Sequence, residues 1–285
     1  MSKVLSAETV QRLERDGYLT GIPVLSPEEV RRYRANLEQF ERDHSAHIKK
    51  LKSKAEVLSP WIVDFATSPR LLDAFEDIFG PNLFLRGVAW RNKAPDGSTF
   101  AGWHQDTAYG VEMTPRHFTA VLALSDCSET TGCLRVIPGS HKWPLLEHAD
   151  YDDPTSILAR GQQIVSDFDR SHIANLALKP GEMAIFDPAI VHGSSPNVGT
   201  DRRIMALITM IPTHAVRQDG VRETAMLVRG IDKHDTFDHE PRPQADCGER
   251  ELAAWTRVIE QRARFIFKDS ALSPSEAYGG TRPAA

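Results

Sequence analysis

Apolar positions in the first eighty residues recur at helical spacing, between residues that start and end helices. Ser6 stands where an N-cap is expected, before an amphipathic segment that ends at Gly17, a residue type favoured at helix C-caps. Ser-Pro pairs at 26–27 and 68–69 place a capping residue and then proline at the first helical position. The pattern predicts three helices, beginning near residues 7, 27 and 69 and the last ending at Gly80.

From residue 82 onward the hydrophobic pattern changes to short runs typical of β-strands. The predicted strands are 83–92, 118–124, 133–137, 172–178, 183–186 and 203–211. Turns rich in Gly, Pro, Asn and Asp separate them, and no helix alternates with a strand, which disfavours a parallel sheet. We therefore predict an α+β fold with a mainly β core, a double-stranded β-helix of the jelly-roll or cupin-like type, with helices packed outside.

The chain is predicted to form a single domain. Residues 1–80 are expected to be mainly helical, residues 82–212 to form the jelly-roll core, and residues 213–285 to form a C-terminal extension with a helix at about 248–267. No internal repeat and no linker rich in Gly and Ser divides the sequence.

Composition and charge narrow the classes of partner. The 285 residues include 34 Lys and Arg against 39 Asp and Glu, a formal net charge of −5 without a block of like charges, so neither nucleic acid nor a membrane is an expected partner. Three cysteines without a C-x-x-C pair predict neither disulfides nor a zinc site and favour the cytoplasm. We expect a small-molecule substrate and a monomer or homodimer, with no signal peptide or membrane span.

A His-x-Asp sequence at 104–106 is the first candidate for metal chemistry. On a strand, residues two apart point to the same face, so His104 and Asp106 can reach one ion. By itself the pattern is weak, because 148–150 repeats it in an acidic loop, which we interpret as solvated surface. The pair at 104–106 differs because it lies between predicted strands.

His192 supplies the third candidate ligand, at the end of an apolar run where the chain turns. Two histidines and one carboxylate on one face of an octahedron leave positions open, as in non-haem Fe(II) oxygenases. A hairpin over 194–200 would return Arg203 beside His192, where its guanidinium would need a carboxylate partner. Ser194 can add a hydroxyl, and alternation allows only one of Arg202 and Arg203 to face inward.

Four segments together resemble the phytanoyl-CoA dioxygenase family of Fe(II)- and 2-oxoglutarate-dependent oxygenases, over roughly residues 10–212. They are Gly-Trp-His-Gln-Asp at 102–106, Thr-Gly-Cys-Leu at 131–134 leading to Ile-Pro-Gly-Ser-His-Lys at 137–142, Lys-Pro-Gly-Glu at 179–182, and His-Gly-Ser-Ser-Pro-Asn at 192–197 with Arg203. Many relatives carry Asn-Gly where this chain has Thr-Gly, a change that still permits a turn.

The resemblance implies a role for several residues. His104, Asp106 and His192 would bind Fe(II), and Arg203 would pair with the distal carboxylate of 2-oxoglutarate with help from Ser194. A further co-substrate contact is expected at Asn92, whereas the histidine at 141 is expected to be architectural. Candidate substrate contacts around the pocket are Gln105, Tyr109, His117 and Trp103.

The implied reaction hydroxylates an unactivated C–H bond with Fe(II), 2-oxoglutarate and O2, and releases succinate and CO2. Halogenating relatives lack the carboxylate ligand, so Asp106 favours hydroxylation. A small metabolite is the expected substrate: an amino-acid-like molecule, an aminophosphonate or a natural product. No cluster of cations is evident near the predicted mouth for the phosphates of an acyl-CoA.

Other interpretations remain open at this point. Desaturation, epoxidation or acyl-CoA hydroxylation would use the same ligands. A zinc hydrolase could use two histidines and a carboxylate but has no need of Arg203. A non-catalytic jelly-roll binding protein would keep the fold without needing the ligands.

Overall fold

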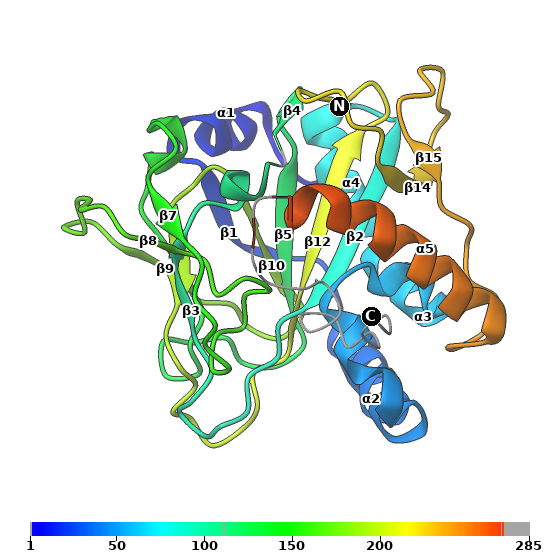
Figure 1. Ribbon diagram of the computed structural model, residues 1–285, viewed down its shortest axis with the longest axis horizontal. Coiled ribbons are helices and arrows are strands. Elements are labelled where there is room, and N and C mark those ends of the chain that lie inside the picture. The colour runs from blue at the N-terminus through cyan, green and yellow to red at the C-terminus, as the bar shows by residue number, and fades with distance from the viewer. Residues whose placement is uncertain (1, 111, 269, 271–285) are drawn as a thin grey trace.

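Two β-sheets face each other in the computed structural model, which describes residues 2–110, 112–268 and 270 (Figure 1). The larger sheet has seven strands, in the order β1 (Tyr18–Pro23), β10 (Glu182–Phe186), β5 (Phe118–Ala123), β12 (Met205–Pro212), β2 (Leu83–Trp90), β14 (Thr224–Arg229) and β15 (Asp238–His239). The smaller sheet has four, in the order β3 (Ala101–His104), β11 (His192–Ser194), β6 (Leu134–Val136) and β9 (Ala174–Leu176). Two short pairs join β4 (Met113–Thr114) to β13 (Val216–Arg217) and β7 (His148–Ala149) to β8 (Gln163–Ile164).

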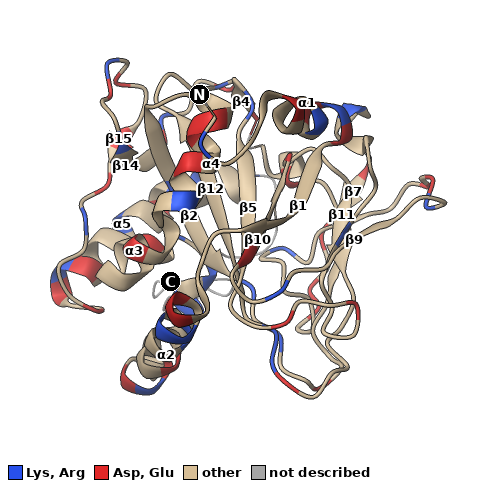
Figure 2. Cartoon of the chain, turned by 180° about the vertical axis from the view of Figure 1, so that it is seen from behind, with Lys and Arg blue, Asp and Glu red and all other residues tan. Residues whose placement is uncertain are grey.

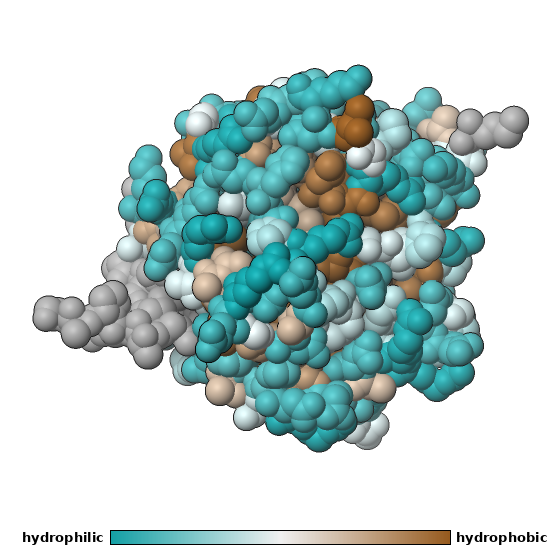
Figure 3. Space-filling view, turned by 90° about the vertical axis from the view of Figure 1, so that its right-hand side faces the viewer, coloured by the Kyte–Doolittle hydropathy of each residue, from teal (hydrophilic) through white to brown (hydrophobic). Residues whose placement is uncertain are grey.

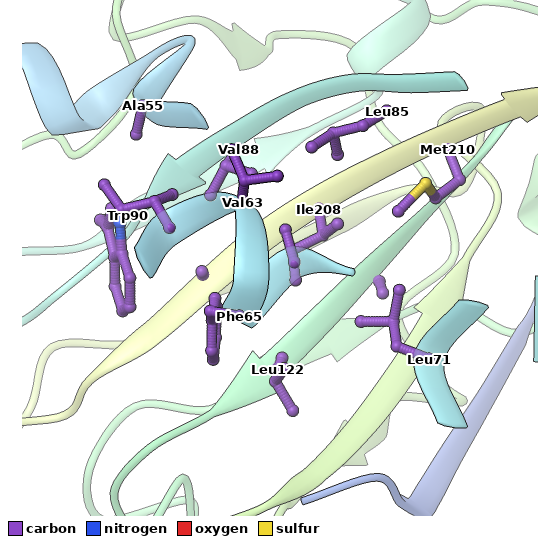
Figure 4. Close-up of a cluster of buried hydrophobic side chains, with 14 of the residues drawn as sticks. Ala55, Val63, Phe65, Leu71, Leu85, Val88, Trp90, Leu122, Ile208 and Met210 are labelled. Atoms are coloured by element: carbon purple, nitrogen blue, oxygen red, sulfur yellow. The ribbon is translucent and has the colours of Figure 1, made fainter. Parts of the chain in front are cut away.

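Strict alternation in the central strands separates a helix-covered face from a cavity face. In β12, Ala206, Ile208 and Met210 belong to the main apolar core, whereas the residues between them line a cavity. Figure 4 shows Ile208 and Met210 among side chains from β2, β5 and the N-terminal helices. Burying this face drives the sheet and helices together, at about 25 cal/mol per Å² of apolar surface.

Among the described residues, five α-helices and four 3₁₀ segments surround the sheets. The helices are α1 (Ala7–Asp16), α2 (Pro27–Asp43), α3 (Pro60–Ala66), α4 (Pro69–Phe79) and α5 (Glu249–Ile266), and the 3₁₀ segments are η1 (Ser45–Lys52), η2 (Ala55–Val57), η3 (Asp106–Tyr109) and η4 (Ser140–Lys142). Local signals act as predicted: Ser6 caps α1, Ser26 and Glu29 form a capping box on α2, and Gly17 ends α1 with φ +83°.

The predicted fold class is confirmed, and several elements of the described residues lie outside the predicted helices and strands, including β3 and β11. A strand, β1, follows α1 and pairs with β10, so the N-terminal region contributes to the larger sheet as well as to the helical layer. The short helix α3 lies between α2 and α4. The C-terminal region adds β14, which pairs with β2, before the expected helix α5. Part of this region, residues 271–285, lies outside the described residues.

Charged residues of both signs are interspersed on the surface. Figure 2 shows blue and red segments along the same helices, including α2 and α5. The face in Figure 3 is mostly hydrophilic, with an apolar area in its upper half. None of the helices in the described part of the chain has the length and apolarity needed to cross a bilayer.

Candidate metal and co-substrate site

His104, Asp106 and His192 converge, and one ligand atom from each lies within 4.8 Å of the others. The Nε2 atom of His104 is 3.4 Å from Asp106 Oδ1, and that of His192 is 3.8 Å from the same oxygen. The two imidazole centroids are 4.0 Å apart. These separations suit three ligands around one ion better than direct hydrogen bonds between them.

Backbone carbonyls fix both histidine rings in the orientation that metal binding requires. His104 Nδ1 is 2.8 Å from the carbonyl oxygen of Gly102, and His192 Nδ1 is 2.9 Å from that of Ile190. A carbonyl can only accept, so each Nδ1 carries the proton and each Nε2 presents a lone pair. This second set of contacts is typical of metal-binding histidines. The donor set therefore fits a divalent ion with open coordination positions.

Strand pairing accounts for the meeting of the two histidines. His192 in β11 is directly opposite His104 in β3, in an antiparallel pair. Asp106 does not share the strand with His104, contrary to the sequence argument, because β3 ends at His104 and Asp106 begins η3. The 3₁₀ turn folds the carboxylate back toward the rings, so the alternation assumed for a strand is not what brings them together.

The charges within the triad shift the pKa values of its members. Burial raises the pKa of Asp106, but the adjacent His192 and His104 outweigh burial and hold it below its usual range. Burial and then the neighbouring His104 lower the pKa of His192 to about 4. At neutral pH the site therefore offers a carboxylate and a neutral imidazole, the forms that bind metal.

The Pro-Gly-Ser-His segment supports the strand that carries His192. Ser140 Oγ donates to the carbonyl of Ile137 (2.7 Å) and accepts from the backbone N–H of Val191 (2.8 Å). His141 Nε2 is 3.1 Å from the carbonyl of Glu14 in α1, and its ring lies against Gly17, where a Cβ would be 2.3 Å from His141 Nδ1. The segment joins α1 to the metal site.

Arg203 is fully buried beside the triad without a carboxylate partner among the described residues. Its guanidinium donates to the backbone carbonyls of Gly132 and Arg91, and its Nε finds no acceptor there. Burial lowers the pKa of Arg203 to about 10, so the group stays charged. A buried cation with only neutral partners is costly, which makes a bound anion favourable.

Ser194 and Lys93 complete this region. Lys93 Nζ donates to Ser194 Oγ (2.7 Å) and to the carbonyl of Ser195 (2.5 Å). Sequence reasoning missed Lys93, although its place next to the predicted strand 83–92 marks it as a charged residue at the end of an apolar run. Burial and the positive charge of Arg203 lower the pKa of Lys93 to about 6.

The route by which Arg203 reaches His192 differs from the expected hairpin. β11 belongs to the smaller sheet and β12 to the larger, so the turn between them crosses from one sheet to the other. Arg203 pairs through its backbone with Lys93 just before β12 begins. Its neighbour Arg202 faces outward, with 29% of its side chain exposed, and pairs with Glu41 at 2.8 Å.

A cavity of about 150 Å³ connects the triad with Arg203 and Ser194. A water molecule needs on the order of 10–15 Å³ by this measure, so the space suits a small organic molecule. Of the four predicted substrate contacts, Tyr109 and His117 line the cavity.

Trp103 and Gln105 lie outside the cavity lining. The Trp103 ring packs on Phe168 and Arg135 because alternation along β3 turns it away from His104. The Gln105 side chain is buried and hydrogen-bonded to the backbone. Its Nε2 donates to the carbonyl of Ala189, and its Oε1 accepts from the N–H of Leu146.

Asn92 also lies outside the cavity lining, just beyond the end of β2. Its Oδ1 is buried without a hydrogen-bond partner among the described residues. The predicted co-substrate contact therefore stays a prediction.

The His-Ala-Asp sequence at 148–150 is not a solvated loop, which corrects the sequence interpretation. His148 is half-buried at the start of β7, and its Nε2 accepts the backbone N–H of Gln105 (3.0 Å). Asp150 pairs with Arg160. This histidine thus supports the chain between His104 and Asp106, and its Nε2 is occupied.

A second charged cluster lines the cavity and was not found from the sequence. Arg86 in β2 and Arg262 in α5 both belong to the lining, and both bind Glu223. The arginines are far apart in the chain, which is why no basic cluster was evident. The available signal was Arg86 itself, a charge inside the apolar run of 83–90.

Facing sheets with a two-histidine, one-carboxylate site define the class of non-haem iron oxygenases with a jelly-roll core. The family model described as phytanoyl-CoA dioxygenase (PhyH) matches residues 13–205. The chain therefore belongs to the phytanoyl-CoA dioxygenase family.

Individual relatives agree with this assignment. Peroxisomal phytanoyl-CoA dioxygenase of Bos taurus is 27% identical over 227 residues, which cover 69% of this chain and 65% of that enzyme, just under two thirds of its length. Ectoine dioxygenase of Bordetella bronchiseptica is 28% identical over 231 residues, 68% of this chain and 71% of that protein. The solved structure of the non-heme monooxygenase ThoJ, in its apo form, has a TM-score of 0.79 at 25% identity and covers 91% of this chain and 97% of its own.

Proposed function

We propose that this protein is an Fe(II)- and 2-oxoglutarate-dependent dioxygenase that hydroxylates a small metabolite and releases succinate and CO2. One observation carries the proposal: a convergent His104, Asp106 and His192 share a cavity with Arg203, a buried guanidinium that has no carboxylate partner among the described residues. A metal-binding protein without a 2-oxoacid would have no use for such an arginine.

In this proposal, His104, Asp106 and His192 would hold Fe(II) and leave coordination positions free for other ligands. Bound Fe(II), with 2-oxoglutarate and O2, supplies the oxidising chemistry. The carbonyls of Gly102 and Ile190 keep both Nε2 lone pairs directed at the ion. Asp106 supplies the negative charge, and its presence favours hydroxylation over halogenation, which needs that position free.

Arg203 is proposed to bind the distal carboxylate of 2-oxoglutarate. Its unsatisfied Nε and its full charge favour an anion, and the Ser194 hydroxyl can donate to the same carboxylate. Lys93 positions Ser194 by holding its oxygen. We assign Asn92 a lesser contact in which its amide NH2 donates, because all the oxygens of 2-oxoglutarate are acceptors.

A small metabolite suits the cavity better than a long acyl chain. Relatives carry names that include ectoine dioxygenase and L-proline trans-4-hydroxylase, which support an amino-acid-like substrate for this chain as well. We also propose that residues 1–285 work as one domain. Its three free, buried cysteines support a reducing compartment such as the cytoplasm.

Anaerobic titration of the metal-free protein with Fe(II) and then 2-oxoglutarate tests the proposal. A chelated 2-oxoacid should produce a weak visible charge-transfer band that requires both additions. The His192→Ala variant should lose the band, whereas His172→Ala, which removes an exposed histidine, should keep it. A wild-type protein that binds Fe(II) and shows no band with 2-oxoglutarate would refute the oxygenase assignment.

A further inference from the structure

The cavity wall away from Arg203 carries a second polar group, built on β2 and on the residue before β5. Arg86 Nη1 is 3.3 Å from His117 Nε2, and the same guanidinium binds Glu223 with bonds of 2.8 to 3.2 Å. Arg86 and His117 line the cavity, although both side chains are almost completely buried. Thr119 and Thr209 lie on the same wall, with their hydroxyls 3.2 Å apart.

The contact with Arg86 fixes the proton on His117. A guanidinium has donors only, so His117 Nε2 must accept, and the proton of the neutral ring is on Nδ1. Burial and the positive charge of Arg86 lower the pKa of His117 to about 3, which keeps the ring neutral at physiological pH. That Nδ1–H is buried and has no acceptor among the described residues. It is a donor without an acceptor in the wall of a cavity.

Arg262 presents a second donor of this kind. It reaches the cavity from α5, and its Nη1 donates to Glu223 Oε1 at 3.2 Å. Its Nε is buried and has no acceptor within the described part of the chain. Buried donors of this type are seldom left unsatisfied in a folded protein unless water or a ligand meets them.

The charges around this wall leave one positive charge in excess. Three arginines, Arg86, Arg217 and Arg262, all bind Glu223, and Arg217 has a second carboxylate in Asp219. The arginines therefore outnumber the carboxylates that bind them by one. The nearby buried Lys54 pairs with Glu240 at 2.5 Å and lies 3.8 Å from Glu56. Burial and the charge of Glu240 raise the pKa of Glu56 to about 8, so that carboxyl is mainly neutral at physiological pH and does not change the balance.

We propose that this wall, through His117 Nδ1 and Arg262 Nε, binds a carboxylate of the substrate. The inference rests on the proposed oxygenase function and adds a substrate class to it: small molecules with a carboxylate in addition to the carbon that is oxidised. An acceptor with one negative charge satisfies both donors and cancels the excess charge. Arg86 holds His117 in place, and the threonine hydroxyls are available to neighbouring polar atoms of the substrate.

The carboxylate site is distinct from the co-substrate site in its residues. Ser194 ends β11 and Arg203 lies just before β12, whereas His117 directly precedes β5 and Arg262 lies in α5. A substrate held by the second group and 2-oxoglutarate held by the first would meet at the triad, because all of these residues line one cavity.

Calorimetric titration with matched acids and amides tests this inference. Protein loaded with Fe(II) and 2-oxoglutarate under anaerobic conditions would be titrated with acetate and acetamide, then with benzoate and benzamide. We expect each acid to bind at least tenfold more tightly than its amide. Arg262→Gln should reduce this preference to less than twofold, and Arg262→Lys should retain part of it. Arg264→Gln, an exposed change on the same helix, should leave it intact.

His117 gives an independent check. His117→Phe removes the Nδ1 donor at similar size, and His117→Asn restores an N–H near the same position, so the preference should fall in the first and recover in part in the second. Thermal unfolding of each variant establishes that it is folded. Equal binding of acid and amide by the wild-type protein, or an Arg262→Gln variant that behaves as Arg264→Gln does, would overturn the inference.

Two further results separate this inference from the proposed function. If the charge-transfer band never forms, the oxygenase assignment fails, and the same titration of the metal-free protein still decides whether a carboxylate site exists. If Arg262→Gln weakens 2-oxoglutarate binding and Arg203→Met does not, the wall holds the co-substrate, and the inference of a substrate site is wrong.

Discussion

Two groups of arginines contribute to the walls of one cavity, and they differ in how their charge is balanced. Arg86, Arg217 and Arg262 share the carboxylate of Glu223, and Arg217 also pairs with Asp219, so two of their three positive charges are compensated within the protein. Arg203 has only backbone carbonyls, which accept its protons without supplying a negative charge. Salt bridges of the first kind hold a wall together, whereas an uncompensated charge of the second kind is tolerated for the sake of a ligand.

The pKa values of neighbouring groups reflect the same contrast. Beside Arg203, burial and like charge lower the pKa of Lys93 to about 6, and no carboxylate of the described residues forms an ion pair with it. In the other group, burial alone would raise the pKa of Glu223, but Arg86 and Arg262 reverse the shift and lower it to about 2. The positive charge around Arg203 lacks a carboxylate partner among the described residues, whereas most of the charge around Glu223 is paired.

Removing the shared carboxylate should have the largest effect. Glu223→Gln leaves three arginines buried together, and breaking a buried ion pair of this kind costs about 3–5 kcal/mol of unfolding free energy. Urea denaturation measures the loss. Glu260→Gln, an exposed change on α5, should stay within about 0.5 kcal/mol of wild type. A Glu223→Gln variant as stable as this control would mean that the arginines do not depend on Glu223.

Arg203→Met should weaken the binding of 2-oxoglutarate more than it lowers the stability of the fold. We expect the affinity for 2-oxoglutarate to fall about 100-fold, equivalent to about 2.7 kcal/mol, while Fe(II) still binds. Calorimetry with each component provides the measurement. Arg202→Met is the matched control, because that side chain faces Glu41 on the outside. If Arg202→Met were the damaging change, the assignment of the inward arginine would be off by one position.

Acid should weaken the ion pairs between Glu223 and its arginines. The pKa of Glu223 is about 2 in the folded protein, against 4.5 for an ordinary glutamate in the unfolded chain. The contribution of Glu223 to the unfolding free energy is therefore complete well above pH 4.5 and declines as the pH falls toward 2. Between pH 6 and pH 3 the wild-type protein should lose about 2 kcal/mol more unfolding free energy than Glu223→Gln. Parallel denaturation curves for the two proteins at these pH values would argue against the ion pairs.

Asn92→Ala should have the smallest effect. One neutral hydrogen bond contributes about 1 kcal/mol, so loss of the proposed contact should weaken 2-oxoglutarate binding about fivefold. The readout is the dissociation constant from the charge-transfer titration. Because Asn92 Oδ1 has no partner among the described residues, stability should change little. Unchanged affinity would remove Asn92 from the co-substrate site.

Local signals in the sequence were sufficient for much of the fold, and long-range contacts account for what was missed. The caps at Ser6 and Ser26 predicted helix starts correctly because capping depends on residues three positions apart. The hairpin expected before Arg203 was wrong because a turn sequence does not reveal which sheet the next strand joins. Helix capping is decided by neighbours in the chain, whereas the pairing of a strand is not.

The site shows the same division. His104, Asp106 and His192 could be chosen from spacing and context, and the structure places them together. The cluster around Glu223 could not, since its arginines come from β2, β13 and α5. Trp103 and Gln105 were chosen by proximity to His104 in sequence, and side-chain direction turned both away.

The register that places His192 opposite His104 has a mechanical consequence. β3 is an edge strand of the smaller sheet, and its last residue is a candidate ligand. An ion bound to both histidines would act as a removable cross-link between two strands that are distant in the chain. Chelation of the metal should then release the end of β3 and speed hydrogen–deuterium exchange there first. Metal occupancy and local opening of the smaller sheet would therefore be coupled, and a change in one could be measured through the other.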